Sequence, residues 1–314
     1  MENLPPLPAA SPRVTVLLAT HNGRAWLPEQ LDSILGQQGA DVRIIALDDG
    51  STDGTREWLL EQTATEPRLC VLPMRTASRG AADNFYRLLQ QADFGPGELI
   101  AFADQDDVWL PGKLARHADL LQRLGCDGVS SNVTAFTPEG TRTLIDKAYP
   151  QRRFDYIFES PGPGSTFLMS FRLAALARDL LAAGGPAASV EYHDWLIYVV
   201  ARAKDWRWLI DPEPTVDYRQ HEHNVMGANV GIRSALSRLR LISRHWHREQ
   251  ASLLAGIAVE VAGGNTHAEL SALQPLLSSG AIAARFRLAG RCTQFRRRRR
   301  DQMILGALIT IGLW

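Results

Sequence analysis

Hydrophobic positions follow two different periods along the first 124 residues of the chain. Short runs of β-branched and apolar residues predict buried strands, whereas apolar residues spaced three and four positions apart predict helices. Because strands and helices take turns, the pattern predicts an α/β fold with a mainly parallel sheet flanked by helices. The strands are expected at residues 13–20, 42–47, 69–72 and 99–103, and the helices at 27–35, 55–62, 81–91 and 111–124.

The pattern is less regular beyond Asp127. Beyond Ile232 only helical spacing remains, so we divide the chain into an α/β domain at residues 1–230 and a helical C-terminal extension at 231–314. In the second part of the α/β domain, strands are expected at residues 128–136, 164–171 and 207–210, and a helix at 194–203.

Composition places the chain among ordinary globular proteins, with 45% hydrophobic and 22% charged residues. No apolar run reaches the roughly 20 residues that a membrane-spanning helix needs, and the first residues lack the pattern of a secretory signal. Cys70, Cys126 and Cys292 show neither metal-binding nor redox spacing. These features predict a cytoplasmic protein without a disulfide framework.

Charge is distributed unevenly along the chain. Residues 232–314 carry 13 arginines against 4 acidic residues, whereas residues 1–231 carry 21 basic against 30 acidic residues. This asymmetry predicts a site that uses cations in the body of the protein and a polyanionic surface near its C-terminus.

The strongest chemical signal is an acidic cluster directly after the strand at 99–103. Asp104, Asp106 and Asp107 crowd into four positions, and carboxylates so close together repel one another unless a divalent cation binds them. Such a cation would attract a substrate diphosphate. A calcium loop is excluded because Trp109 occupies the sixth position, where the loop requires glycine. The alternative is a polar turn with a helix cap.

A second acidic loop, Asp48-Asp49-Gly50-Ser51, follows the strand at 42–47. A carboxylate at this position can accept hydrogen bonds from a nucleobase or from ribose hydroxyls, and glycine lets the backbone approach a ligand. The same residues also suit an ordinary turn. The sequence contains neither a dinucleotide-binding glycine fingerprint nor a Walker lysine loop.

Taken together, four motifs resemble the family 2 glycosyltransferases: Thr20-His21-Asn22-Gly23, Leu31–Gln37, Asp48–Asp53 and Asp104–Trp109. Their order and spacing match over roughly residues 13–225. Two later motifs, His193-Asp194-Trp195 and Tyr218–Asn224, resemble the bacterial rhamnosyltransferase-like branch of that family. The resemblance implies a Rossmann-like GT-A fold, a nucleotide-sugar donor, Mg²⁺ or Mn²⁺ as cofactor, and inversion at the anomeric carbon.

The resemblance also assigns site residues. Asp106 and His221 would bind the metal, and Asp194 would be the general base that deprotonates the acceptor hydroxyl. His193 stands where the family has Glu, which makes Glu191 a second candidate for the base, and Asp194 could instead cap the helix at 195–203. The residues expected to bind the nucleotide sugar are Thr20, Asn22, Asp48, Asp49, Asn84, Asp104, Gln105, Arg219 and His221.

Two further features leave a functional and a structural reading open. Gly164-Ser165-Thr166 could give a sugar room to approach or could form a strand bulge. Trp195, Trp206 and Trp208 could stack on acceptor sugars, although core packing is the expected use of at least two of them.

The resemblance to this branch implies the transfer of one sugar, with L-rhamnose from dTDP-rhamnose as the first expectation and a UDP-sugar as the alternative donor. The acceptor that it implies is a saccharide or a lipid-linked saccharide in surface polysaccharide synthesis. The Gln-x-x-Arg-Trp signature of polymer-building relatives is missing. Two rival functions remain. A sugar nucleotidyltransferase would need a basic glycine-rich loop after the first strand, and a non-catalytic saccharide- or membrane-binding relative would be expected to lose its carboxylates.

The basic tail, residues 285–314, predicts a peripheral anchor on an anionic membrane. Arg296–Arg300 precede the apolar segment 303–314, which is too short to span a bilayer. The alternatives are a helix that packs within the protein and a nucleic-acid patch. Nucleic acid is not expected as a partner, because the run lacks interleaved aromatic residues. The expected location is the inner face of the cell membrane.

Overall fold

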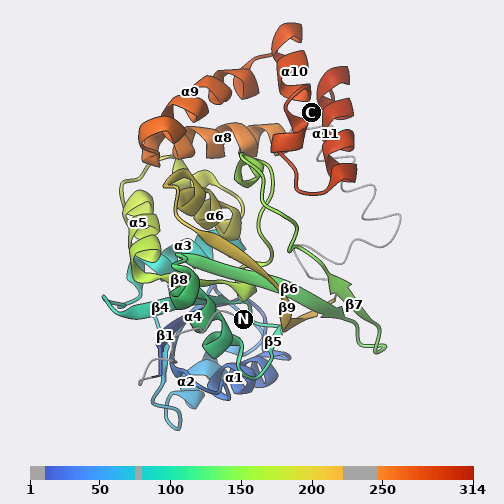
Figure 1. Cartoon of the computed structure of the whole chain (residues 1–314). Helices are drawn as coiled ribbons and strands as arrows, with labels where there is room; N and C mark the ends of the chain where they lie inside the picture. Colours follow the sequence, from blue (N-terminus) through green and yellow to red (C-terminus); the bar gives the residue numbers. More distant parts are fainter. Residues whose placement is uncertain (1–10, 75–79, 222–245) are drawn as a thin grey trace.

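The computed structural model describes residues 11–74, 80–221 and 246–314. Every strand and helix predicted between residues 13 and 124 is present (Figure 1). These elements are β1 (Arg13–Thr20), α1 (Leu27–Leu35), β2 (Asp41–Asp48), α2 (Thr55–Gln62), β3 (Leu69–Val71), α3 (Ala81–Gln91), β4 (Glu98–Ala103) and α4 (Lys113–Leu124).

Helix α4 begins at Lys113, two residues later than predicted. Gly112 immediately before it has a φ of 81°, in the left-handed region. A right-handed helix cannot include such a residue, so Pro111 belongs to the preceding turn.

The strands form one mixed sheet. Within the described residues the order is β3-β2-β1-β4-β8-β6-β9-β5, and β7 pairs with β6. Strands β3, β2, β1 and β4 are parallel to one another, as predicted. In the register of the sheet Thr20 lies opposite Asp48 and Leu18 lies opposite Ala103. The loops that follow β1, β2 and β4 therefore meet at one edge.

Beyond β4 the pairing becomes largely antiparallel, with β8 antiparallel to both β4 and β6. Strands β6 and β9 are parallel to each other. The elements of this part are β5 (Val108–Trp109), β6 (Gly128–Phe136), β7 (Arg142–Ile145), β8 (Leu168–Ser170), α5 (Phe171–Ala182), α6 (His193–Ala203) and β9 (Trp208–Arg219).

The strand expected at 164–171 is wrong over most of its length. Gly164–Thr166 form a turn of 3-10 helix, and only Leu168–Ser170 pair in the sheet. Ser170 then caps helix α5 by accepting a hydrogen bond from the Leu173 N–H. A serine at a helix N-cap ends the extended backbone there.

The strand expected at 207–210 is longer than predicted and continues to Arg219. It pairs with β6 from Gly128 to Phe136 across an irregularity between Ser131 and Val133. Strand β5 joins its other edge, where Val108 lies opposite Asp217. This pairing brings the residues after β9 to the loop that carries Asp104, Asp106 and Asp107, which is called the acidic loop.

Alternating residues of each central strand enter two separate hydrophobic cores. Val16 and Leu18 of β1 belong to the core formed with α1, α2 and α4. Leu17 and Ala19 belong to the core formed with α3, α5 and α6. The sheet therefore has helices on both faces, as the alternating pattern predicts.

The described part of the C-terminal extension is helical, as predicted. It comprises α8 (Trp246–Val261), α9 (Gly264–Ser278), α10 (Ile282–Ala289) and α11 (Arg299–Ile311), which stack beyond α6 in Figure 1. Buried residues of α8 share one continuous core with α6. The domain boundary expected at residue 230 lies outside the described residues. None of the helices in the described ranges is both long and apolar enough to cross a membrane.

Part of the basic tail packs within the protein, in agreement with the alternative of a packing helix. Arg296 and Arg298 donate hydrogen bonds to the carbonyls of Phe158 and Asp146 in the α/β domain, and Arg297 is 3% exposed. Three of the five consecutive arginines are therefore used inside the protein.

The apolar residues of the tail divide in the same way. Leu305, Ile309 and Trp314 are buried, and the Trp314 indole donates to Nδ1 of His247 on α8 at 2.8 Å. The side chains that remain exposed are Met303, Ile304, Ile311 and Leu313.

Candidate active site

Thr20 and Asp48 join the loops that follow β1 and β2. The Thr20 hydroxyl donates to Oδ1 of Asp48 at 3.0 Å. The Ser51 N–H donates to Oδ2 of the same carboxylate at 3.0 Å, and the Asp49 N–H donates to the Thr20 carbonyl at 2.9 Å. These contacts bring together three residues predicted to bind the nucleotide sugar. The buried Asp48 carboxylate is already engaged in shaping the loops.

Asn22 and Asn84 also connect the loops that follow β1 and β2. Asn22 has a φ of 49°, a conformation that asparagine tolerates better than most residues, and its Oδ1 accepts the Thr52 N–H at 2.8 Å. The Asn84 amide on α3 donates to the carbonyls of Thr20 and Leu47 at 3.3 and 3.1 Å. Both predicted residues therefore hold the ends of β1 and β2 together.

Gln105 connects the acidic loop to the loop after β1. Its side-chain oxygen accepts the His21 N–H at 2.7 Å, and its amide nitrogen donates to the His21 carbonyl at 2.9 Å. A Cβ atom on Gly23 would lie 2.1 Å from Oε1 of Gln105, so this close approach requires glycine. The loops after β1, β2 and β4 thus form one rigid frame.

The three clustered carboxylates lie in different surroundings. Burial, followed by the charges of Asp106 and Asp194, raises the pKa of Asp104 to about 8. Burial and the same kind of repulsion, from Asp106 and Asp104, raise the pKa of the fully buried Asp107. The repulsion predicted from the sequence is therefore present, and Asp107 faces the interior of the protein.

The two predicted metal ligands are in contact with each other. Nε2 of His221 lies 2.7 Å from Oδ2 of Asp106, and the His221 ring stacks on Trp26 with 4.2 Å between centroids. Neighbouring ligands of an octahedral Mg²⁺ lie about 2.9 Å apart, since each is about 2.0–2.1 Å from the ion. The observed 2.7 Å is the distance of a hydrogen bond between the two side chains, and the same oxygen and nitrogen are donor types that would bind a divalent cation.

No group of three or more His, Cys, Asp or Glu side chains is placed to hold a metal ion among residues 11–74, 80–221 and 246–314. The motif residues Glu222, His223 and Asn224 lie outside the described residues.

Arg219 supports the acidic loop. Its Nε donates to the Asp106 carbonyl at 2.8 Å, its backbone N–H donates to Asp107 at 3.3 Å, and its guanidinium pairs with Glu29. The predicted contact of Arg219 with the donor diphosphate stays a prediction, as does a donor contact of Asp49. The Asp49 carboxylate lies 3.9 Å from the Arg87 guanidinium.

Asp194 lies in the first turn of α6, with both carboxylate oxygens hydrogen-bonded. Oδ1 accepts the Trp195 N–H at 2.7 Å, and Oδ2 accepts the Ser160 hydroxyl at 2.9 Å. Burial raises its pKa to about 6, whereas these two hydrogen bonds and the Lys147 charge act in the opposite direction. The neighbouring His193 ring lies 5.0 Å, between centroids, from the Phe102 ring of β4, so the first turn of α6 packs against the strand that leads into the acidic loop.

The capping alternative for Asp194 needs a correction. Helix α6 begins at His193 and not at Trp195, so Tyr192 occupies the N-cap position. Asp194 accepts a free N–H from within the first turn, where a carboxylate also interacts favourably with the helix dipole. Glu191, the second candidate for the base, is exposed.

His193 is a packing residue next to the candidate base. Its ring stacks on Phe85 with 3.8 Å between centroids, and burial lowers its pKa to about 3, so it is neutral. A Cβ atom on Gly164 would lie 2.3 Å from Nε2 of His193. Gly164 therefore makes room for this ring. The strand bulge expected here is wrong, because Gly164–Thr166 form a turn of 3-10 helix, whereas room for a sugar at this position stays a prediction.

Two of the three tryptophans belong to the core, as expected. The Trp195 indole donates to the Tyr156 carbonyl at 2.7 Å, and the Trp208 indole donates to the Ser130 hydroxyl at 3.0 Å. Trp206 is partly exposed beneath Arg172, whose guanidinium carbon is 4.5 Å from the ring centroid.

Sequence reasoning missed three residues of the site: Trp26, Lys147 and Ser160. Trp26 supports His221, and Ser160 and Lys147 act on Asp194. None belongs to a motif of catalytic residues, and each reaches the site only through tertiary packing. The one local signal is the Ser160-Pro161-Gly162 sequence, which predicts a turn without saying what it faces.

Comparison with known proteins identifies the family of the chain. The model of the family described as "Glycosyl transferase family 2" matches residues 15–183. The dTDP-rhamnosyl transferase RfbG of Shigella flexneri is 38% identical over 240 residues, which cover 76% of this chain and 83% of that protein.

Solved structures show the same fold at low sequence identity. Residues 1–349 of S. aureus TarS, in complex with UDP-GlcNAc, superimpose with a TM-score of 0.58 at 18% identity, covering 96% of this chain and 81% of that chain. The mannosyltransferase PcManGT from Pyrobaculum calidifontis, in complex with GDP-Man and Mn²⁺, gives 0.54 at 20% identity, covering 99% and 88%. The predicted GT-A fold is confirmed. The chain is a glycosyltransferase and belongs to glycosyl transferase family 2.

Proposed function

We propose that the enzyme transfers a single L-rhamnosyl unit from dTDP-rhamnose, with inversion, to a hydroxyl of a saccharide acceptor in surface polysaccharide synthesis. The donor assignment rests on the similarity to the Shigella rhamnosyl transferase over three quarters of the chain. Family membership sets aside the sugar nucleotidyltransferase alternative. The carboxylates Asp104, Asp106 and Asp194 favour an active enzyme over a binding protein.

The mechanism is supported by the position of Asp194 in the first turn of α6, which packs through His193 against the strand that leads into the acidic loop. Each carboxylate oxygen accepts one hydrogen bond from the protein and keeps a lone pair for a further donor. The acceptor hydroxyl loses its proton to Asp194 as its oxygen bonds to the anomeric carbon. The bond from that carbon to the diphosphate oxygen breaks, and its electron pair leaves with dTDP. A pKa of about 6 keeps the base ionised at neutral pH.

Asp106 and His221 would hold Mg²⁺ or Mn²⁺, whose charge would stabilise the departing diphosphate. The frame that contains Thr20, Asp48 and Gln105 would then receive the nucleoside. Asn22, Asp49, Asn84, Asp104 and Arg219 would complete the binding site or support it. We assign these roles to a domain at residues 1–230 and treat residues 231–314 as its extension.

The remaining exposed face of α10 and α11 would bind an anionic membrane, where a lipid-linked acceptor resides. Ile282 and Phe286 of α10 and Met303 and Ile304 of α11 are exposed. Exposed arginines flank them, namely Arg287, Arg299 and Arg300. An apolar face bordered by cationic side chains complements lipid tails and anionic headgroups.

A thermal-shift comparison of nucleotide sugars in the presence of Mn²⁺ tests the donor. A donor at 100 times its Kd stabilises the folded protein by about 2.7 kcal/mol. We expect dTDP-rhamnose and dTDP to raise the melting temperature more than UDP-glucose, UDP-GlcNAc or GDP-mannose. A larger shift with a UDP- or GDP-sugar would overturn the donor assignment.

A further inference from the structure

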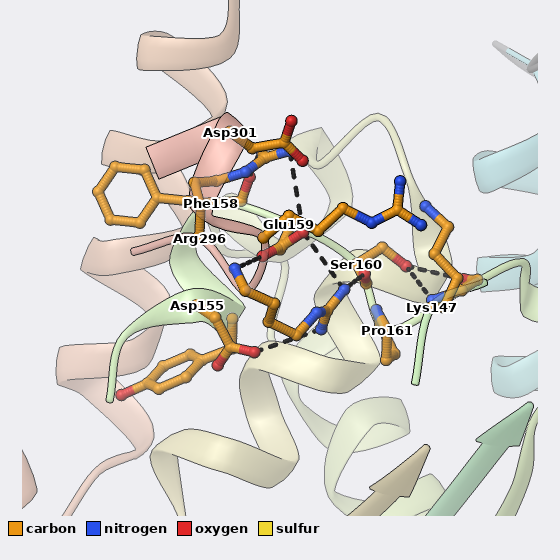
Figure 2. Close-up of polar contacts among 12 residues, drawn as sticks. Lys147, Asp155, Phe158, Glu159, Ser160, Pro161, Arg296 and Asp301 are labelled. Carbon is orange, nitrogen blue, oxygen red and sulfur yellow. Dashed lines mark hydrogen bonds and ion pairs between the residues drawn. The ribbon is translucent and has the colours of Figure 1, made fainter. Parts of the chain in front are cut away.

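Arg297 of the C-terminal extension is 3% exposed. It contacts the segment of the α/β domain that carries Asp155, Glu159 and Ser160, which are labelled in Figure 2. Its guanidinium lies 3.3 Å from Asp155 and 3.4 Å from Glu159 and donates to the Ser160 carbonyl at 2.5 Å. Its backbone N–H also donates to Glu159, at 2.6 Å. One residue of the extension thus contacts three residues of a single segment, 155–160, from another part of the chain.

The charges around Arg297 form a buried network. Asp155 is fully buried and is shared between Arg297 and Arg202, whose Nη1 lies 3.1 Å away. Glu159 also faces Arg296, at 3.8 Å. A buried arginine is stable only when it is well paired, and such pairs fix geometry more than they add stability. Within this network the Arg297 guanidinium contacts both Asp155 and the Ser160 carbonyl, whereas the hydrogen bonds of Arg202 go to Asp155, Tyr198 and the Arg152 carbonyl.

Ser160 connects this network to the candidate base. Its carbonyl accepts from Arg297, and its hydroxyl reaches Oδ2 of Asp194 at 2.9 Å and the Gly162 carbonyl at 2.8 Å. The hydroxyl has one proton to donate, and an ionised carboxylate is the stronger acceptor. Two successive hydrogen bonds thus link Arg297 to Asp194.

We propose that Arg297 is a positioning residue for sugar transfer, because it fixes Ser160 and thereby aims the Asp194 carboxylate at the acceptor hydroxyl. The inference rests on the proposed role of Asp194 as base. It makes the C-terminal extension part of the catalytic apparatus. The donor frame of Thr20, Asp48 and Gln105 has its own hydrogen bonds and does not depend on Arg297.

Arg202 provides a matched control. It pairs with the same buried Asp155 and with the Tyr198 hydroxyl, at 2.7 Å, and its remaining hydrogen bond goes to the Arg152 carbonyl. Arg202→Gln therefore disturbs the same ionic network and leaves the Arg297–Ser160 contact in place. If the network only maintained the fold, Arg297→Gln and Arg202→Gln would lower kcat by the same factor.

The test compares Arg297→Gln, Ser160→Ala, their double variant and Arg202→Gln in the full chain. A small misplacement of a catalytic group lowers turnover roughly 10- to 100-fold. We expect Arg297→Gln and Ser160→Ala each to lower kcat by about that factor, with the donor KM within about twofold of wild type. The double variant should be no slower than the slower single variant, because both substitutions break one chain of contacts. Arg202→Gln should lower the melting temperature and keep kcat near wild type.

Several results would overturn the inference. They are an unchanged kcat in Arg297→Gln, additive losses in the double variant, or equal losses of kcat in Arg297→Gln and Arg202→Gln. If Arg297→Gln does not fold, Arg297→Lys and Ser160→Ala decide. Retained kcat in the lysine variant, which can still donate to the Ser160 carbonyl, together with a loss of kcat in Ser160→Ala supports the inference. Full kcat in Ser160→Ala contradicts it. Asp194→Asn separates the two proposals: near-normal turnover in that variant refutes the base itself, whereas an inactive Asp194→Asn with a normal Arg297→Gln refutes only the positioning role.

Discussion

The imidazole of His221 and the carboxylate of Asp106 are 2.7 Å apart, although 115 positions separate them in the sequence. The pairing of β5 with β9 brings them together, because Val108 lies opposite Asp217. Stacking on Trp26 fixes the orientation of the His221 ring. Two potential ligands of a divalent cation thus converge at the acidic loop.

Asp106→Ala should remove the dependence of dTDP binding on Mn²⁺, because it deletes the carboxylate that would bind the ion. In His221→Ala, which keeps the Asp106 carboxylate, Mn²⁺ should still strengthen dTDP binding, but less than in wild type. Isothermal titration of dTDP with Mn²⁺ and with EDTA measures both effects. Equal stimulation of dTDP binding by Mn²⁺ in wild type and Asp106→Ala would contradict the metal assignment.

Turnover should depend on the ionisation of Asp194. Burial raises its pKa to about 6, so the ionised base is present above that pH and is lost as the pH falls through it. We expect kcat to decrease about tenfold per pH unit well below pH 6. Ser160→Ala removes a hydrogen bond that lowers this pKa, so the acid limb should move to higher pH. A kcat profile that stays flat down to pH 5 would contradict this assignment.

Gly23→Ala should weaken donor binding through the loop frame. The new Cβ would lie 2.1 Å from Oε1 of Gln105, which must move and release the backbone of His21. We expect the donor KM to rise several-fold, with a smaller change in kcat. Gly54→Ala is the comparison for backbone strain: its φ is 85°, yet a Cβ there meets nothing within 4 Å. If the two variants have the same donor KM, the contact with Gln105 does not matter for binding.

Liposome co-sedimentation tests the membrane face. The full chain should sediment with anionic vesicles at low salt and remain in the supernatant with neutral ones. Each arginine near an anionic surface contributes about 1 kcal/mol, so Arg299→Gln with Arg300→Gln should weaken binding roughly 30-fold. Ile304→Ser should weaken it further at every salt concentration, since apolar contact is not screened. Failure of the full chain to sediment with anionic vesicles would refute the membrane contact.

The parts of the fold that were predictable are those whose signal is local. Arg13–Thr20 and Leu27–Leu35 have the predicted bounds because each carries its periodicity within one short segment. The meeting of the loop carboxylates at one edge of the sheet was also predictable, because parallel strands end at the same edge.

The remaining features depend on contacts that no local pattern encodes. The space for His193 against Gly164 arises from the packing of α6 on the sheet. Arg297 looks like its neighbours in a basic run, and only the fold shows that it is buried against Asp155. Ser160 resembles any turn residue until Asp194 is placed opposite it.

Turnover of Asp194→Asn with dTDP-rhamnose and a saccharide acceptor tests the central claim most directly. Asparagine has nearly the same shape, and its amide can keep both contacts: its oxygen accepts the Trp195 N–H, and its nitrogen donates to the Ser160 hydroxyl, which then donates to the Gly162 carbonyl. The amide cannot take the proton of the acceptor. We predict a loss of kcat of at least ~100-fold, the usual scale for a general base, with unchanged affinity for the donor. Near-normal transfer by Asp194→Asn would contradict the assignment of the base and the mechanism built on it.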